Sequence, residues 1–240
     1  MNEIGIAPMR PEHAAEVAAI HRSVLPESIY SALGQRFLEY YYRNLLRNNG
    51  FFGYVHIFDK RVTGFAAATS QSMSVFWRQI ALDGFRIGGV LAQTLIERPA
   101  AIRAAAQAVG FLLTERRAML PAVKGELLSF AVLPAYRVNE LGPDGAVRST
   151  AFYATQHVPV AAELFRATVR ELARREVRDL KIMTGAANTA SNRFYAKMGC
   201  RLLPERFTAF GYTTHLYYAE IAGLIQDAAV APAIPSEAAV

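Results

Sequence analysis

The spacing of apolar and polar residues divides the N-terminal part of the chain into short strands and amphipathic helices. Apolar residues that recur every three or four positions predict helices from Arg10 to about Ser23 and from about Gly34 to Arg47. Shorter apolar runs predict a first strand and then a hairpin, whose turn is Asp59-Lys60-Arg61. The three strands are expected at residues 4–8, 51–58 and 62–69.

The middle of the chain changes from a helical pattern to a strand and then to turn residues. Residues 75–123 are rich in Ala, Leu, Ile and Arg, which predicts a helical insertion. A mostly apolar run from Glu126 to Leu133 ends at a proline, which is typical of a strand buried on both faces. Residues 137–155 carry a Gly-Pro-Asp-Gly turn signal and are expected to form an inserted loop or hairpin.

The C-terminal part predicts two more helices with strands after each. An amphipathic helix should run from Val160 to about Glu176, directly after Pro159. A strand is expected at 180–184, and a helix at 190–198 that Gly199 ends. The last strand or strands should lie within 207–221, and residues 226–240, rich in Ala and Pro, read as a flexible tail.

This order of elements predicts an α/β fold in which helices flank a mixed sheet. A chain of 240 residues is long enough to bury one core efficiently. We therefore expect a single domain over residues 1–225, with the insertion and the inserted loop as elaborations of it.

Composition limits the class of protein, its expected location and the sites that it can contain. The chain is 52% apolar and 19% charged and has no apolar run of membrane-spanning length, which excludes a disordered chain and predicts a protein without membrane association. No secretory leader is apparent, so a bacterial-type cytoplasmic location is expected. The single Cys200 and five scattered histidines predict no metal site and no disulfide.

The formal net charge of +6 favours an anionic ligand, because a positive field concentrates anions near the protein. Coenzyme A, a nucleotide sugar or an RNA would all satisfy it. The arginines are spread along the chain, which is more typical of a solvated surface than of a nucleic-acid footprint.

One segment carries a specific pattern. Asn188 precedes the 190–198 helix, Tyr195 follows seven positions later, and Lys197-Met-Gly199 ends the helix. This pattern resembles the GNAT superfamily of N-acyltransferases, from which it departs only in Cys200, where the family has an aromatic residue. The resemblance implies a mixed, mostly antiparallel central sheet, in which the helical segment 75–123 is an insertion between the third and fourth strands. Without the resemblance, Tyr195 would be read as an ordinary buried hydroxyl bonded to the backbone.

A second resemblance involves the strand that begins at Glu126. Val132, Pro134 and Tyr136-Arg137 are similar to the end of the family's fourth strand, and Glu126 lies six residues before that valine. The resemblance implies that Glu126 is a general base for the acceptor amine, because an ammonium must lose a proton before its nitrogen can attack a thioester. The alternative is a glutamate at the exposed entrance of a strand.

The third resemblance is incomplete. The family's pyrophosphate loop is matched best by Gln156-His-Val-Pro-Val-Ala161, where Pro159 replaces a glycine and removes one N–H donor. Together the resemblances imply Glu126 and Tyr195 as catalytic residues, and an acyl-CoA site lined by Ser129, Phe130, Ala131, Val132, Gln156, His157, Val158, Val160, Ala161, Asn188 and Tyr195.

The implied function is transfer of an acetyl or other acyl group from acetyl-CoA or another acyl-CoA to the amine of a small molecule by direct attack. The acceptor could be an amino sugar, an antibiotic, an amino acid or a protein amine. Two alternatives remain open: a GNAT-type transferase that uses aminoacyl-tRNA or an acyl-carrier protein as donor, and a non-catalytic GNAT-like binding module. A monomer or homodimer is expected.

Overall fold

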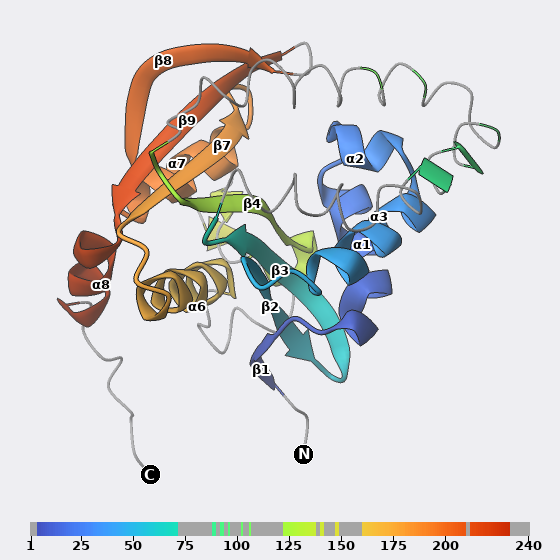
Figure 1. Ribbon diagram of the computed structural model, residues 1–240. Coiled ribbons are helices and arrows are strands. Elements are labelled where there is room, and N and C mark those ends of the chain that lie inside the picture. Colours follow the sequence, from blue (N-terminus) through green and yellow to red (C-terminus); the bar gives the residue numbers. More distant parts are fainter. Residues whose placement is uncertain are drawn as a thin grey trace, which may run out of the picture.

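The protein is built around a seven-stranded sheet with helices on both faces (Figure 1). The computed structural model describes residues 4–71, 88–89, 92–93, 96, 102, 106, 122–137, 140–141, 147–148, 160–209 and 212–230. The strand order is β1-β2-β3-β4-β7-β9-β8. The strands span β1 Ile4–Pro8, β2 Phe51–Phe58, β3 Arg61–Thr69, β4 Gly125–Val132, β7 Asp179–Gly185, β8 Arg201–Ala209 and β9 Tyr212–Glu220.

Neighbouring strands pair antiparallel throughout this sheet, except for the parallel pair β4 and β7. The predicted mixed, mostly antiparallel sheet is therefore confirmed. The parallel pair lies at an important place in the strand order, because it joins the four N-terminal strands to the three C-terminal strands.

Two helical layers cover the sheet (Figure 1). On one face lie α1 (Ala14–Val24), which packs on β3 and β4, and α3 (Gln35–Leu45), which packs on α1. Val17, Leu38 and Phe65 belong to the apolar cluster on this face. On the other face lie α6 (Val160–Arg174), α7 (Thr189–Lys197) and α8 (Ile221–Val230). Their apolar side chains form a second cluster around Leu164 and Ile182. Each face of the sheet therefore has its own apolar core.

Most predicted elements of the N-terminal part are confirmed. The 3₁₀ turn Pro11–His13 leads into α1, and a short helix α2 (Ile29–Ala32) lies between α1 and α3, where no element was predicted. The hairpin turn is one residue tighter than expected: Asp59 and Lys60 both have positive φ, and Arg61 already pairs with Phe58. Positive φ at both central residues matches the right-handed twist of the strands.

The C-terminal part differs from the prediction in two elements. Strand β8 begins at Arg201, before the predicted region of residues 207–221. Its first residues were not predicted as a strand, because polar residues and Pro204 interrupt the apolar pattern. After β9 the chain forms α8 up to Val230, so the helix extends into the segment that was expected to be a flexible tail. Leu224 of α8 is buried, and contact with α6 supplies the apolar surface that this short helix needs.

The two predicted elaborations are described only in part. Most of the 75–123 insertion lies outside the described residues, although residues 88–89, 92–93, 96, 102 and 106 are helical. Within the 137–155 loop, β5 (Glu140–Leu141) pairs antiparallel with β6 (Val147–Arg148), which agrees with the hairpin alternative. A 3₁₀ turn, η3 (Pro134–Tyr136), connects β4 to this hairpin.

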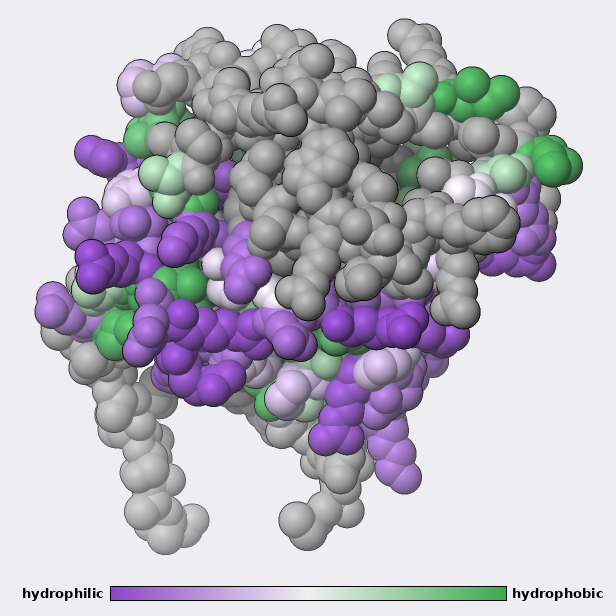
Figure 2. Space-filling model, in the orientation of Figure 1, coloured by the Kyte–Doolittle hydropathy of each residue, from purple (hydrophilic) through white to green (hydrophobic). Residues whose placement is uncertain are grey.

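The described surface in the view of Figure 2 is mainly hydrophilic, and its apolar residues lie in small separate groups. In the described part of the chain, no helix combines the length and apolarity needed to cross a bilayer. Nor do these residues bring three or more metal-ligating side chains together.

Gly125 permits β4 to approach β7 closely. A Cβ at this position would overlap the Asp179 carbonyl oxygen and touch Val177. We expect Gly125→Ala to destabilise the fold by about 1–3 kcal/mol, because rigid backbone would have to move. Urea unfolding would measure the difference. Gly5→Ala is the control, since a Cβ there meets no atom within 4 Å; equal losses for both variants would contradict the close approach.

Candidate active site

The sheet opens between β4 and β7. These strands form only three residue pairs, Gly125 with Leu180, Glu126 with Lys181 and Leu127 with Ile182. A bulge follows immediately, because Ala68 pairs with Leu127 and Ala67 with Ser129, which leaves Leu128 without a partner on β3. From Ser129 to Val132 no described strand pairs with the β7-facing edge of β4. The backbone groups on that edge are therefore available to a ligand.

Glu126 is the middle residue of the three through which β4 pairs with β7, directly before the opening. It is only 3% exposed, so the alternative of a glutamate at an exposed strand entrance is wrong. Its side chain points to the sheet face opposite Leu127, which is the face covered by α1 and α3. The candidate base is thus a buried carboxylate beside the opening.

Lys181 is a residue of this site that was not predicted from the sequence. It is the cross-strand partner of Glu126 and is 2% exposed, and its Nζ lies 4.0 Å from Glu126 Oε2. Burial of a charged group is costly unless an opposite charge lies near it, and this ammonium is placed to pair with the carboxylate. A lone lysine inside the apolar run Leu180–Thr184 was the available signal.

Tyr195 lies on the other face of the sheet, in the cluster that α6 and α7 cover. Its ring is 4% exposed and packs against Phe130, Phe165, Phe194 and Tyr217. Among the described residues, the hydroxyl that hydrogen-bonds to Asn192 of α7 belongs to the neighbouring Tyr217 and not to Tyr195. Burial raises the pKa of the Tyr195 hydroxyl well above its ordinary value, with smaller contributions from Cys200 and Tyr217, so it stays protonated at neutral pH.

Two asparagines hold the Tyr195 helix. Asn188 is the N-cap of α7 and its Oδ1 accepts from the Ser191 backbone N–H at 3.1 Å, which fits its predicted place at the helix start. Asn192, which was not predicted, donates to the carbonyls of Gly185, Ala186 and Asn188, and accepts from the Tyr217 hydroxyl at 3.0 Å. Asn192 therefore fixes α7 to the end of β7 and to the middle of β9.

Comparison with known proteins agrees with this geometry. No protein-family model and no curated protein matches the chain. Solved structures do match. A GNAT-family acetyltransferase from Desulfovibrio desulfuricans aligns with 90% of this chain and 99% of its own, at a TM-score of 0.51 and 14% identity. Arabidopsis thaliana NAA60 in complex with acetyl-CoA aligns with 92% and 100% of the two chains, at a TM-score of 0.53 and 14% identity.

A third match is PaiA N-acetyltransferase from Thermoplasma acidophilum in complex with coenzyme A, with 91% of this chain and 99% of that chain covered, a TM-score of 0.50 and 10% identity. The chain has the GNAT fold. The predicted fold class is confirmed, whereas identities this low say nothing about the reaction.

The predicted donor-binding residues are only partly brought together in this GNAT fold. Ser129, Phe130, Ala131 and Val132 are consecutive on the open part of β4, and the Phe130 ring stacks on Phe194 of α7. Val160 and Ala161 begin α6, where Val160 is buried against the apolar core. Gln156, His157 and Val158 lie outside the described residues.

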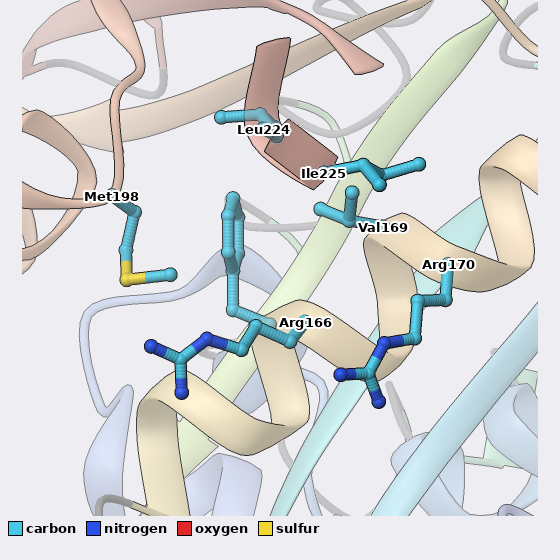
Figure 3. A pocket seen from close by; sticks show the side chains of 7 residues that line it. Arg166, Val169, Arg170, Met198, Leu224 and Ile225 are labelled. Carbon is cyan, nitrogen blue, oxygen red and sulfur yellow. The ribbon is translucent and has the colours of Figure 1, made fainter. Parts of the chain in front are cut away.

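Two arginines of α6 lie beside a shallow pocket of about 190 Å³. Arg166 and Arg170 line it together with Met198 of α7 and Leu224 and Ile225 of α8. Figure 3 shows both guanidinium groups on the same side of α6, with the Met198 side chain beyond Arg166. Neither arginine makes an ion pair with another described residue. Arg137 is used elsewhere, since its Nε donates to the Val132 carbonyl at 2.8 Å.

Proposed function

We propose that this protein is an N-acyltransferase that moves an acetyl or other acyl group from an acyl-CoA to the amine of a small molecule. The observation that carries the proposal is the opening between β4 and β7, with the Glu126 carboxylate toward one face of the sheet and the Tyr195 ring toward the other. A donor that enters from the Tyr195 face would meet the candidate general acid. An acceptor that enters from the Glu126 face would meet the candidate general base.

The donor side of the proposal rests on the unpaired edge of β4. Backbone groups of Phe130 and Ala131 would hydrogen-bond to the pantetheine arm, as an added strand does. A backbone N–H of the same edge would stabilise the oxyanion that forms when the thioester carbonyl is attacked. Tyr195 would give its proton to the leaving thiolate. Burial raises the pKa of its hydroxyl, so this group carries a proton at neutral pH.

On the acceptor side, Glu126 would take a proton from the ammonium of the acceptor. Lys181, whose Nζ lies 4.0 Å from Glu126 Oε2, would hold the carboxylate in place beside the opening. The 75–123 insertion follows β3 and precedes β4, so we propose that it shapes the acceptor pocket and selects the amine.

Isothermal titration calorimetry with acetyl-CoA and longer acyl-CoAs tests the donor. We expect saturable binding, and a panel of amino sugars, amino acids and aminoglycosides would then be screened by release of the coenzyme A thiol. Absence of acyl-CoA binding at millimolar concentration would defeat the proposal.

We expect Glu126→Gln to lower kcat by about 100-fold, the usual magnitude for loss of a general base. The neutral amide keeps the shape of the side chain but cannot accept the proton. Steady-state kinetics with a responsive amine would measure the loss. Asp179→Asn is the matched control, since this carboxylate lies on β7 and accepts from the Tyr218 hydroxyl at 2.6 Å; an equal loss in both variants would remove Glu126 from the mechanism.

The pocket beside α6 favours a second candidate, a GNAT-fold transferase whose acyl group arrives on an acidic carrier protein. Arg166 and Arg170 have no acidic partner among the described residues, and the adjoining Met198 and Ile225 are apolar, which suits an amphipathic acidic surface. Arg166→Glu/Arg170→Glu should weaken transfer from an acyl-carrier protein and leave transfer from acyl-CoA unchanged. A steep salt dependence of tRNA binding would instead support aminoacyl-tRNA as donor.

A further inference from the structure

The pair of Glu126 and Lys181 places a primary amine of the chain itself beside the candidate general base. The two residues are cross-strand partners on β4 and β7, and Lys181 Nζ lies 4.0 Å from Glu126 Oε2. An acceptor amine has to take the same position, because the base removes a proton only from an amine within its reach. Such contacts are commonly longer than a hydrogen bond before the substrates bind and shorten afterwards. Lys181 is therefore placed as an acceptor would be.

The opening for the donor begins directly after this pair. Leu127 and Ile182 form the last residue pair between β4 and β7, and one residue adds only about 3.3 Å along a strand. Cross-strand partners share a face of the sheet, so Nζ lies on the Glu126 face, from which an acceptor would enter. Lysine carries its amine on a flexible four-carbon stem. The stem lets Nζ move from the carboxylate toward an acyl group held at the open edge of β4.

Burial restricts how Lys181 can be acylated. The side chain is 2% exposed, which keeps free acyl-CoA in solution and the site of a second molecule away from Nζ. The other three lysines of the chain, Lys60, Lys124 and Lys197, are exposed. Uncatalysed acylation from solution would therefore modify those three first. An acyl group on Lys181 has to come from a donor bound in the opening of the same molecule.

We propose that Lys181 is a self-acylation site, to which the protein transfers the acyl group of its own bound acyl-CoA when no other acceptor is present. The inference rests on the proposed function, because the donor and the base are those assigned there. It goes beyond that function by naming an acceptor inside the chain. The product is a neutral amide that accepts no second acyl group, so the reaction stops at one group on this residue.

The atoms and protons of the step balance. Glu126 takes one proton from the Nζ ammonium, and the neutral amine attacks the thioester carbonyl. The C–N bond forms as the C–S bond breaks, and the leaving sulfur takes the proton of Tyr195. The nitrogen gives up its second proton as the amide forms, which restores the Tyr195 hydroxyl, and Glu126 releases its proton to water. The products are N-acyl-lysine, the coenzyme A thiol and one proton.

Mass spectrometry of the full chain, incubated with acetyl-CoA and no amine, tests the proposal directly. We expect one acetyl group to be added to Lys181 about 100-fold faster than to Lys60, Lys124 or Lys197, the usual magnitude of base catalysis. The rate constant should not depend on protein concentration, and the preference should vanish in protein unfolded with urea. An unmodified Lys181, a rate no faster than at the exposed lysines, or a rate constant that rises with protein concentration would overturn the proposal.

Two variants identify the groups that take part. Lys181→Arg keeps a cation beside Glu126, but a guanidinium does not lose its proton to become a nucleophile, so the fast acetylation should disappear. Lys124→Arg is the matched control and should keep it, since Lys124 is exposed. Glu126→Gln should slow acetylation of Lys181 about 100-fold. Fast acetylation that persists in Lys181→Arg, or an unchanged rate in Glu126→Gln, would contradict the inference; the mapping on the unmodified protein holds whether or not these variants fold.

Failure of the inference and failure of the proposed function give different results. Absence of acetyl-CoA binding by the unmodified protein in calorimetry would defeat the acyl-CoA proposal and, with it, the donor for Lys181. Saturable binding of acetyl-CoA and transfer to an added amine, with Lys181 left unmodified, would defeat only the self-acylation.

Discussion

Tyr195→Phe should lower kcat by about 100-fold, the effect expected when a general acid is removed. The leaving thiolate would have to take its proton from water. The KM for the acyl donor should change little, because the ring and its contacts with Phe130 and Phe165 remain. Steady-state release of the coenzyme A thiol measures both constants.

The stability of Tyr195→Phe should be close to that of the unmodified protein. The hydroxyl has no hydrogen-bond partner among the described residues, so its removal leaves no buried group unsatisfied. Tyr217→Phe is the matched comparison in the same cluster, since its hydroxyl donates to Asn192 at 3.0 Å and its loss should cost about 1 kcal/mol of stability. Unchanged kcat in Tyr195→Phe would remove this tyrosine from the mechanism.

The second large effect concerns the buried pair of Lys181 and Glu126. Lys181→Met should reduce the free energy of unfolding by about 3–5 kcal/mol, because it removes one partner of a buried ion pair. Urea unfolding followed by circular dichroism would measure it. The double variant Glu126→Gln/Lys181→Met should recover much of the loss, since neither buried charge remains.

Lys124→Met is the control for the loss of a lysine. Lys124 is exposed and comes directly before β4, so its replacement should change the free energy of unfolding by no more than about 0.5 kcal/mol. If Lys181→Met is as harmless as Lys124→Met, the ammonium does not support the Glu126 carboxylate.

Local patterns predicted the elements whose signals are strong. The hairpin of β2 and β3 was predicted from two apolar runs around a polar turn, and α6 from its apolar stripe, because both signals come from neighbouring residues. The first part of β8 and the helix α8 were not predicted. The apolar contacts that stabilise them come from β9 and α6, which no local window contains.

The residues of the candidate site also fall into those that local motifs predict and those that they do not. Glu126, Asn188 and Tyr195 could be predicted because they belong to contiguous motifs. Lys181 could not, because it matters only through a partner distant in sequence. The pairing of β4 with β7 brings Lys181 to Glu126.

The sequence by itself determined that this chain folds as an α/β protein with a GNAT-like motif from Asn188 to Gly199, because periodicity and short motifs are local properties. Only the tertiary structure decided where the sheet opens. That opening depends on Gly125 letting β4 and β7 meet, on the bulge at Leu128, and on the loss of pairing after Leu127. Each of these is a relation between strands that lie far apart in the sequence.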